Sequence, residues 1–111
     1  MAPLPPLPDR AITHSDYIAI KYAARGLLPT ILRRLLPGGR IHSGEYVVRN
    51  PRRHDRTPGS FKIRVHGTRA GAWADFATGE SGGDVISLVA YLDGISQSDA
   101  ASRLGRLLAI H

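Results

Sequence analysis

Residues 60–66 alternate strictly between polar and apolar side chains. The apolar positions are Phe61, Ile63 and Val65, and the polar positions that follow them are Lys62, Arg64 and His66. Because successive side chains of a β-strand point to opposite faces, this pattern predicts a strand with one buried face and one basic face. Such a strand must pair with others, so we expect an antiparallel sheet whose outer face is positively charged.

Two further segments supply the partner strands. Residues 45–49 are rich in β-branched and aromatic side chains, and residues 72–76 follow a glycine-containing turn at 67–71. Residues 50–59 contain two prolines and a glycine, which predicts a loop between the first two strands. The expected sheet therefore has three antiparallel strands, followed by a glycine-rich connector at residues 78–83.

Four helices are predicted around this sheet. They begin at His14 or Ser15 and end at Gly26, span residues 29–36, run from Asp84 to Gly94, and begin at Ser96. The strongly apolar composition of the third helix predicts that it packs on the sheet, and Asp84 and Gly94 suit its two ends. The predicted fold class is therefore α+β: a small three-stranded antiparallel sheet, an apolar helix packed on it and further helices at both ends.

The chain has 111 residues, enough for one domain with a modest core. We expect a proline-rich, disordered segment at 1–13, a helical segment at 14–39 and the α+β unit at 40–111. The absence of cysteine excludes disulfides, thiolate metal sites and a cysteine nucleophile. No apolar run reaches the roughly 18 residues of a membrane span, and the first residues lack the basic region of a signal peptide. A cytoplasmic protein without a membrane partner is therefore expected.

Arginine dominates the charge of the chain. Thirteen of its fifteen basic residues are arginine, against nine acids, and the net charge is +6. Residues 33–69 hold ten basic and two acidic residues, whereas residues 70–102 hold five acids and no base. The guanidinium group binds phosphate bidentately and stacks on bases, so the basic middle favours nucleic acid as a partner. A GC-rich genome, which enriches arginine without a functional reason, is the alternative explanation.

The candidate nucleic-acid-binding residues are basic side chains of the loop and the strand that follows it, together with one aromatic residue. They are Arg49, Arg52, Arg53, Arg56, Lys62, Arg64, Arg69 and Trp73. A basic groove beside an aromatic ring is typical of single-strand binding, in which phosphate contacts provide affinity and base stacking adds to it. Alternatively, the arginines pair with Asp55, Asp75 and Glu80 on a solvated face, and Trp73 belongs to the core.

No catalytic or metal-binding constellation is visible in the sequence. The five histidines show neither HxH nor HxxxH spacing. Asp75, Glu80 and Asp84 could in principle hold Mg²⁺, but pairing with arginine and helix capping are their expected roles. We therefore expect a non-catalytic protein without a cofactor.

The order of motifs over residues 44–108 resembles the zinc-ribbon domain at the N-terminus of bacterial and phage primases of the DnaG type. The matching residues are Asn50-Pro51, the run Asp55-Arg56-Thr57-Pro58-Gly59-Ser60-Phe61, Trp73-x-Asp75-Phe76, Gly79 and Gly82-Gly83-Asp84-x-Ile86. The family carries a CPxH loop that leads to TPSF, then a YxCxxCG turn and an apolar helix after Gly-Asp or Gly-Asn. The likeness is greatest to the cysteine-free versions at the front of plasmid and phage primase–helicases.

In this resemblance the four zinc-ligand positions fall on Asn50, Arg53, Asp75 and Thr78, none of which is cysteine or histidine. The resemblance therefore implies a zinc-ribbon-like fold without the metal, which the sheet and its helix must stabilise instead. Arg53 and Asp75 occupy facing ligand positions, so we expect an ion pair in place of the metal.

In that family the domain helps a primase to engage single-stranded template and forms no bonds itself. The resemblance thus implies a metal-free module that contacts single-stranded DNA in plasmid or phage replication, as part of a primase or primase–helicase or as its accessory. A primase polymerase or a helicase would be the protein partner. Two alternatives remain open: an adaptor or regulator that docks a replication complex through its acidic C-terminal helices, and an inhibitor made from a primase domain.

Overall fold

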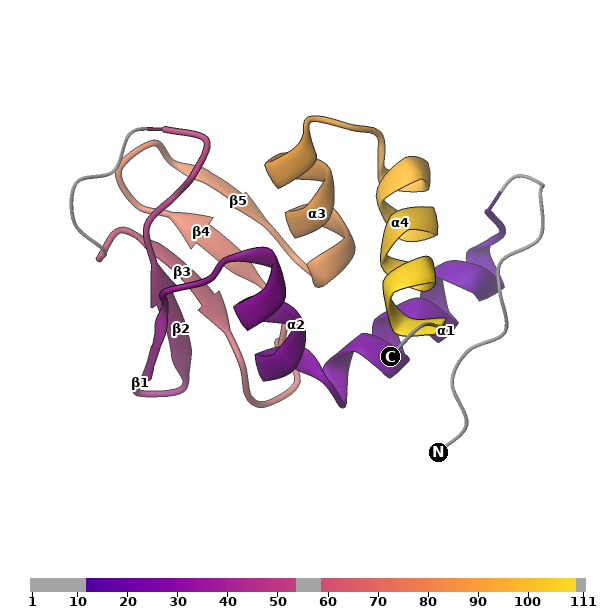
Figure 1. Cartoon of the computed structure of the whole chain (residues 1–111), viewed down its shortest axis with the longest axis horizontal. Helices are drawn as coiled ribbons and strands as arrows, with labels where there is room; N and C mark the ends of the chain where they lie inside the picture. Colours follow the sequence, from indigo (N-terminus) through magenta and orange to yellow (C-terminus); the bar gives the residue numbers. More distant parts are fainter. Residues whose placement is uncertain (1–11, 54–58, 110–111) are drawn as a thin grey trace.

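The computed structural model describes residues 12–53 and 59–109, which form four helices and one sheet (Figure 1). The elements are α1 (His14–Arg25), α2 (Leu28–Leu35), β1 (Arg40–His42), β2 (Glu45–Val48), β3 (Phe61–Arg64), β4 (Trp73–Asp75), β5 (Glu80–Gly82), α3 (Val85–Asp93) and α4 (Gln97–Ala109). Most of the segment predicted to be disordered, residues 1–11, lies outside the described residues, as do Asp55 and Arg56 of the predicted loop.

The sheet is antiparallel throughout, and its five strands lie side by side in chain order. The predicted α+β class is confirmed, but the predicted number of three strands is wrong because β1 and β5 add one strand at each edge. β1 is Arg-Ile-His with all three residues exposed, and β5 is Glu-Ser-Gly from the predicted connector. Neither segment shows buried alternation or β-branched enrichment, so pairing with β2 and β4, rather than local preference, defines them.

The three predicted strands form the centre of the sheet. In β3, Ile63 is buried, Lys62 is half-buried and Arg64 is exposed, as the alternation predicts. The register pairs Ile63 with Tyr46 of β2 and with Trp73 of β4. Because paired residues of antiparallel strands share a face, these three side chains point to the same side of the sheet.

The helices begin and end close to the predicted positions. Thr13 caps α1: its side chain accepts a hydrogen bond from the Asp16 N–H at 3.2 Å, and its own N–H donates to the Asp16 carboxylate at 2.9 Å. Asp84 caps the start of α3, and Gly94 ends that helix in the left-handed conformation, both as predicted.

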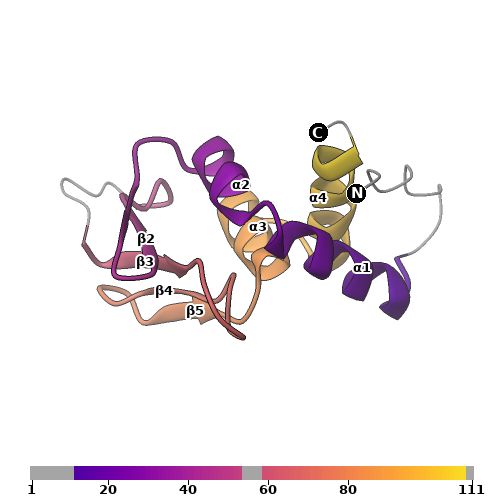
Figure 2. The same cartoon turned by 90° about the horizontal axis from the view of Figure 1, so that it is seen from below.

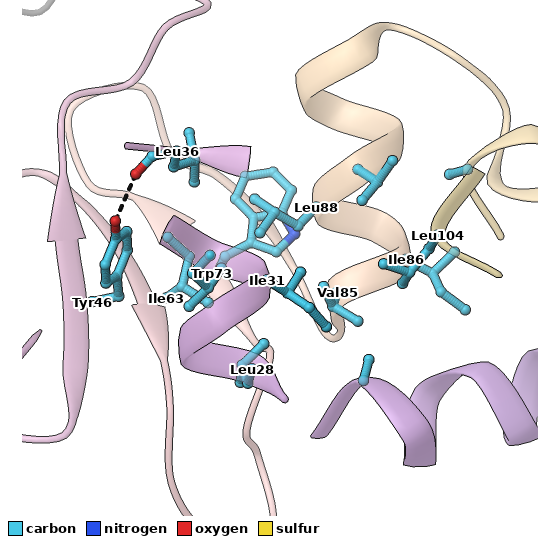
Figure 3. Packing of buried hydrophobic residues seen from close by; sticks show 14 of the residues in the cluster. Leu28, Ile31, Leu36, Tyr46, Ile63, Trp73, Val85, Ile86, Leu88 and Leu104 are labelled. Carbon is cyan, nitrogen blue, oxygen red and sulfur yellow. Dashed lines mark hydrogen bonds between the residues drawn. The ribbon is translucent and has the colours of Figure 1, made fainter. Parts of the chain in front are cut away.

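Two helices, α2 and α3, cover one face of the sheet, and no helix of the described residues covers the other (Figures 1 and 2). α4 packs against α3 and α1 (Figure 1). The core between the helices and the sheet includes Leu28, Ile31, Ile63, Trp73, Val85 and Leu88 (Figure 3). We call the uncovered side of the sheet the outer face.

The end of α2 is fixed to β2 by one buried hydroxyl group. The Tyr46 hydroxyl donates to the Leu36 carbonyl at 2.6 Å (Figure 3) and accepts from the Gly39 N–H at 3.2 Å. A Cβ on Gly39 would overlap the Tyr46 ring, so this close approach requires glycine.

Gly82 of β5 packs directly on the indole of Trp73. A Cβ at Gly82 would overlap the indole Nε1 and the Ser87 Oγ. We expect Gly82→Ala to lower the free energy of unfolding by about 1–3 kcal/mol through overpacking, measured by urea denaturation. Gly83→Ala is the matched control because a Cβ there meets no atom within 4 Å. An equal loss in both variants would contradict this explanation.

Candidate nucleic-acid interface

One row of outer-face side chains crosses all five strands. From β1 to β5 this row is Arg40, Val47, Lys62, Ala74 and Ser81. Its two cations have small or apolar neighbours within the row. The outer face is therefore basic, and its β4 and β5 portion carries only short side chains.

Two more cations lie beside this row. Arg64 of β3 is paired in register with Glu45 of β2, and Arg69 lies in the turn between β3 and β4; both arginines are exposed. Among residues 12–53 and 59–109, no carboxylate forms an ion pair with Arg40, Lys62, Arg64 or Arg69. A group of cations without bound carboxylates attracts a polyanion.

Phe76 is the exposed aromatic residue of this surface. It directly follows β4, its N–H donates to the Ser60 carbonyl at 2.8 Å, and 71% of the residue is exposed. The Lys62 ammonium lies 5.8 Å from the centroid of its ring. The surface thus combines a cation with a solvent-exposed ring, the two components of a single-strand-binding surface.

A shallow groove of about 430 Å³ runs along this part of the sheet, and we call it the sheet groove. It is lined by Glu45, Lys62, Arg64, Arg69, Ala72, Trp73, Ala74, Phe76, Ser81, Gly82 and Gly83. The lining combines three basic residues and Phe76 with one acid, Glu45, and with small residues of β4 and β5.

Trp73 does not present its ring to this groove. It is only 6% exposed, its Nε1–H donates to the Ser87 Oγ at 2.9 Å, and its ring stacks on Tyr91 with the centroids 4.6 Å apart. Trp73 is paired with Ile63, so its side chain points to the helix-covered face of the sheet. The interpretation of Trp73 as a stacking surface for bases is therefore corrected, and the tryptophan is a core residue.

A buried polar cluster joins the loop after β2 to the end of β4. The Asp75 carboxylate is buried and accepts hydrogen bonds from the Arg53 Nε at 2.7 Å, the Asn50 Nδ2 at 2.8 Å and the Ala77 N–H at 2.9 Å. A second Arg53 nitrogen, Nη2, donates to Asp75 Oδ1 at 3.3 Å and also to the Ser60 Oγ. The Arg53 guanidinium thus donates hydrogen bonds within the fold, although about a third of the side chain remains exposed.

Three of the four positions that the resemblance assigns to zinc ligands meet in this cluster, and the predicted ion pair between Arg53 and Asp75 is confirmed. Thr78 lies beside them: its N–H donates to the Asp75 carbonyl at 3.3 Å, and its Oγ1 accepts from the Glu80 N–H at 3.3 Å. Within the described part of the chain, no group of three His, Cys, Asp or Glu residues could hold a metal ion. The two loops are joined here by hydrogen bonds and by the Arg53–Asp75 ion pair.

The Asp75 carboxyl should make folding sensitive to acid. Burial alone would raise its pKa, but hydrogen bonds from Arg53, Asn50 and the Ala77 N–H, with the Arg53 charge, lower the pKa from 3.8 to about 2. Because the folded pKa lies below the unfolded one, this stabilisation is complete above the unfolded pKa and is lost as the pH falls through about 2.

We expect this group alone to remove about 2 kcal/mol of unfolding free energy between about pH 5 and pH 2. Urea denaturation of the natural chain and of Asp75→Asn across this range isolates the contribution, because the amide does not titrate. The difference between the two proteins should shrink as the pH falls. Parallel pH profiles would show that Asp75 does not carry the acid sensitivity.

The remaining loop arginines have different surroundings. The Arg52 guanidinium lies 5.3 Å from the centroid of the Tyr91 ring, and the Arg52 N–H donates to the Asn50 side-chain oxygen at 2.9 Å. Arg52 therefore helps to fix the loop against α3. Arg49 is exposed and has no carboxylate partner among the described residues, whereas Arg56 lies outside them.

Sequence reasoning missed two residues of this surface, Phe76 and Arg40. The signal for Phe76 is present: continuing the alternation past Trp73 and Asp75, which both point inward, directs Phe76 outward. Arg40 has no comparable signal because β1 is too short and too exposed to be recognised.

The acids of the C-terminal half are largely engaged within the molecule. The Asp93 carboxylate pairs with Arg103, and the Asp84 carboxylate lies 3.5 Å from the Lys21 ammonium and also caps α3. These contacts connect α4 to α3 and α1 to the start of α3. They are structural roles, so the acidic charge does not by itself mark a docking surface.

None of the helices in the described ranges combines the length and the apolar character that a membrane crossing requires. No family model, curated protein or solved structure matches this chain.

Proposed function

We propose that this chain binds single-stranded nucleic acid, most specifically single-stranded DNA, on the outer face of its sheet. Lys62, Arg64 and Arg69 would contact phosphates, and Phe76 would stack on a base. The observation that carries the proposal is a ring that is 71% exposed, on a sheet face without helices, beside cations that no described carboxylate pairs. Phosphate contacts supply affinity and stacking supplies selectivity for unpaired bases.

The preference for a single strand follows from the need of the Phe76 ring for an uncovered base face. In a duplex the faces of the bases are covered by their neighbours, so Phe76 contributes only where a base is free. The sheet groove presents no projecting helix for a major groove, and small residues line its far side. An extended single strand fits this surface better than a duplex does.

We further propose that the chain acts in DNA replication, as a non-catalytic part or an accessory of a primase or primase–helicase. The support is the arrangement of two loops, each with a pair of positions three residues apart: Asn50 with Arg53, and Asp75 with Thr78. Asp75 contacts both members of the first pair, through the Asn50 hydrogen bond and the Arg53 ion pair, at positions that the resemblance assigns to zinc ligands.

The test is a titration of labelled single-stranded and duplex oligonucleotides of the same sequence, followed by fluorescence anisotropy at about 50 and 200 mM salt. The single strand should bind more tightly, and its affinity should fall steeply with salt. Emission of the buried Trp73 should change little. Absence of binding to either oligonucleotide at low salt would overturn the proposal.

Arg64→Ala is expected to weaken binding and to reduce the slope of log affinity against log salt by about 0.7, the value for one phosphate contact on a single strand. Arg106→Ala is the matched control, since Arg106 is an exposed arginine on α4 and the substitution changes the net charge equally. If both variants changed the slope alike, the outer face would not be the binding surface.

A further inference from the structure

A second hollow lies where α2 ends, and we call it the α2 hollow. It has a volume of about 700 Å³ and is lined by Leu35, Leu36, Pro37, Gly38, Arg40, Val48, Arg49 and Pro51. Its lining is mostly apolar, and its two charged residues, Arg40 and Arg49, are both exposed. Among the described residues neither arginine has a carboxylate partner. The hollow therefore suits a ligand with a flat apolar part and an anionic part.

A third hollow shares lining residues with both the α2 hollow and the sheet groove. It has a volume of about 480 Å³ and is lined by Gly38, Arg40, Ile41, His42, Val47, Gly59 and Lys62. It shares Arg40 and Gly38 with the α2 hollow and shares Lys62 with the sheet groove. The third hollow thus has one cation in common with each of the other two, Arg40 with the α2 hollow and Lys62 with the sheet groove.

These two shared cations belong to the same row of the sheet. Lys62 and Arg40 are separated by one strand, since each is paired in register with Val47. At the usual spacing of paired strands they are about 10 Å apart across the sheet. Arg49, which directly follows β2, adds a third cation because it lines the α2 hollow together with Arg40.

Resting on the proposed function, we propose that a bound single strand continues from the sheet groove across β1 into the α2 hollow. Arg40 and Arg49 would hold phosphates there, since the planar guanidinium fork matches phosphate oxygens. Leu35, Pro37 and Pro51 would contact a nucleobase. The cations shared between the hollows favour the same strand over a separate ligand as the occupant.

The experiment compares two oligothymidylates, one of about four nucleotides and one of about twelve, because only the longer can span both surfaces. In the full chain, Arg49→Ala should leave the affinity for the short oligonucleotide within about twofold and lower that for the long one about tenfold. Pro51→Glu, which adds a carboxylate at an exposed position of the hollow, should act in the same way. Arg106→Ala should not discriminate between the lengths.

Three results would overturn the extended path. An equal effect of Arg49→Ala on both lengths would show that Arg49 acts only through the overall charge. No effect on either length, with Arg64→Ala still harmful, would leave the sheet groove as the binding surface and assign the α2 hollow to another ligand, such as an acidic peptide. Failure of the natural chain to bind either length would remove the proposed function, and the extended path with it.

Discussion

Asp75→Ala is expected to lower the free energy of unfolding by about 3 kcal/mol, because it removes the acceptor that three donors share inside the fold. Asp75 is fully buried and receives hydrogen bonds from Arg53, Asn50 and the Ala77 N–H. The expected loss is at the low end for a broken buried ion pair, since about a third of the Arg53 side chain remains exposed. Urea denaturation followed by circular dichroism measures the loss.

Asp93→Ala provides the matched control. It also removes the carboxylate of an arginine ion pair, but the Asp93–Arg103 pair lies at the surface. We expect its cost to stay within about 1 kcal/mol. If the two substitutions cost the same, or if Asp75→Ala unfolds at the same urea concentration as the natural chain, the buried cluster does not hold the two loops together.

The contacts of this cluster could not be predicted from local sequence patterns. The pairing of Arg53 with Asp75 was predicted from the positions that a family resemblance made adjacent, not from any local rule, since 22 residues separate the partners. Nothing near Arg53 in the sequence distinguishes it from Arg49, yet one arginine is committed to the fold and the other is exposed. The tertiary structure shows which arginines pair with carboxylates inside the fold and which remain exposed.

The sheet was predictable in its centre and not at its edges. One face of β3 is buried, so its residues alternate between apolar and polar, and this periodicity predicted the strand. The side chains of the edge strands β1 and β5 are mostly exposed. These strands are defined by backbone hydrogen bonds, which impose no alternation of polar and apolar residues on the sequence. For the same reason Arg40, a residue of β1, was not predicted as part of the candidate surface.

Trp73 was predicted as the exposed aromatic residue of the candidate surface, but the exposed ring is that of Phe76. Trp73 and Phe76 both lie at β4, and tryptophan is the stronger stacking residue. Alternation decides between them, because residues three apart in an extended segment point to opposite faces. Trp73 lies in the core, whereas Phe76 is 71% exposed.

Phe76→Ala is accordingly expected to lower the affinity for single-stranded DNA about 5- to 150-fold, the loss of about 1–3 kcal/mol that one stacked base contributes. Affinity for a duplex should change much less, because paired bases do not offer their faces. Stability should be almost unchanged, since the ring is exposed. Anisotropy titrations and urea denaturation of the same preparations measure both properties.

Tyr22→Ala is a close control for this variant. Tyr22 lies on α1 and is 70% exposed, so the substitution removes a comparably exposed aromatic ring from a different surface. It should leave affinity for the single strand unchanged. Equal losses in the two variants would mean that exposed rings contribute nonspecifically, and an equal loss for duplex and single strand would exclude base stacking at Phe76.

Phe76→Trp tests the stacking contact directly. The indole keeps a flat ring beside the Lys62 ammonium, so affinity for single-stranded DNA should be retained or increased. The natural tryptophan is buried, so the new indole adds an exposed fluorophore whose emission a stacked base should quench. Retained binding without quenching would show that the strand follows the cations but does not stack at this position. Quenching that disappears as salt is raised would place the base contact and the phosphate contacts in a single binding event.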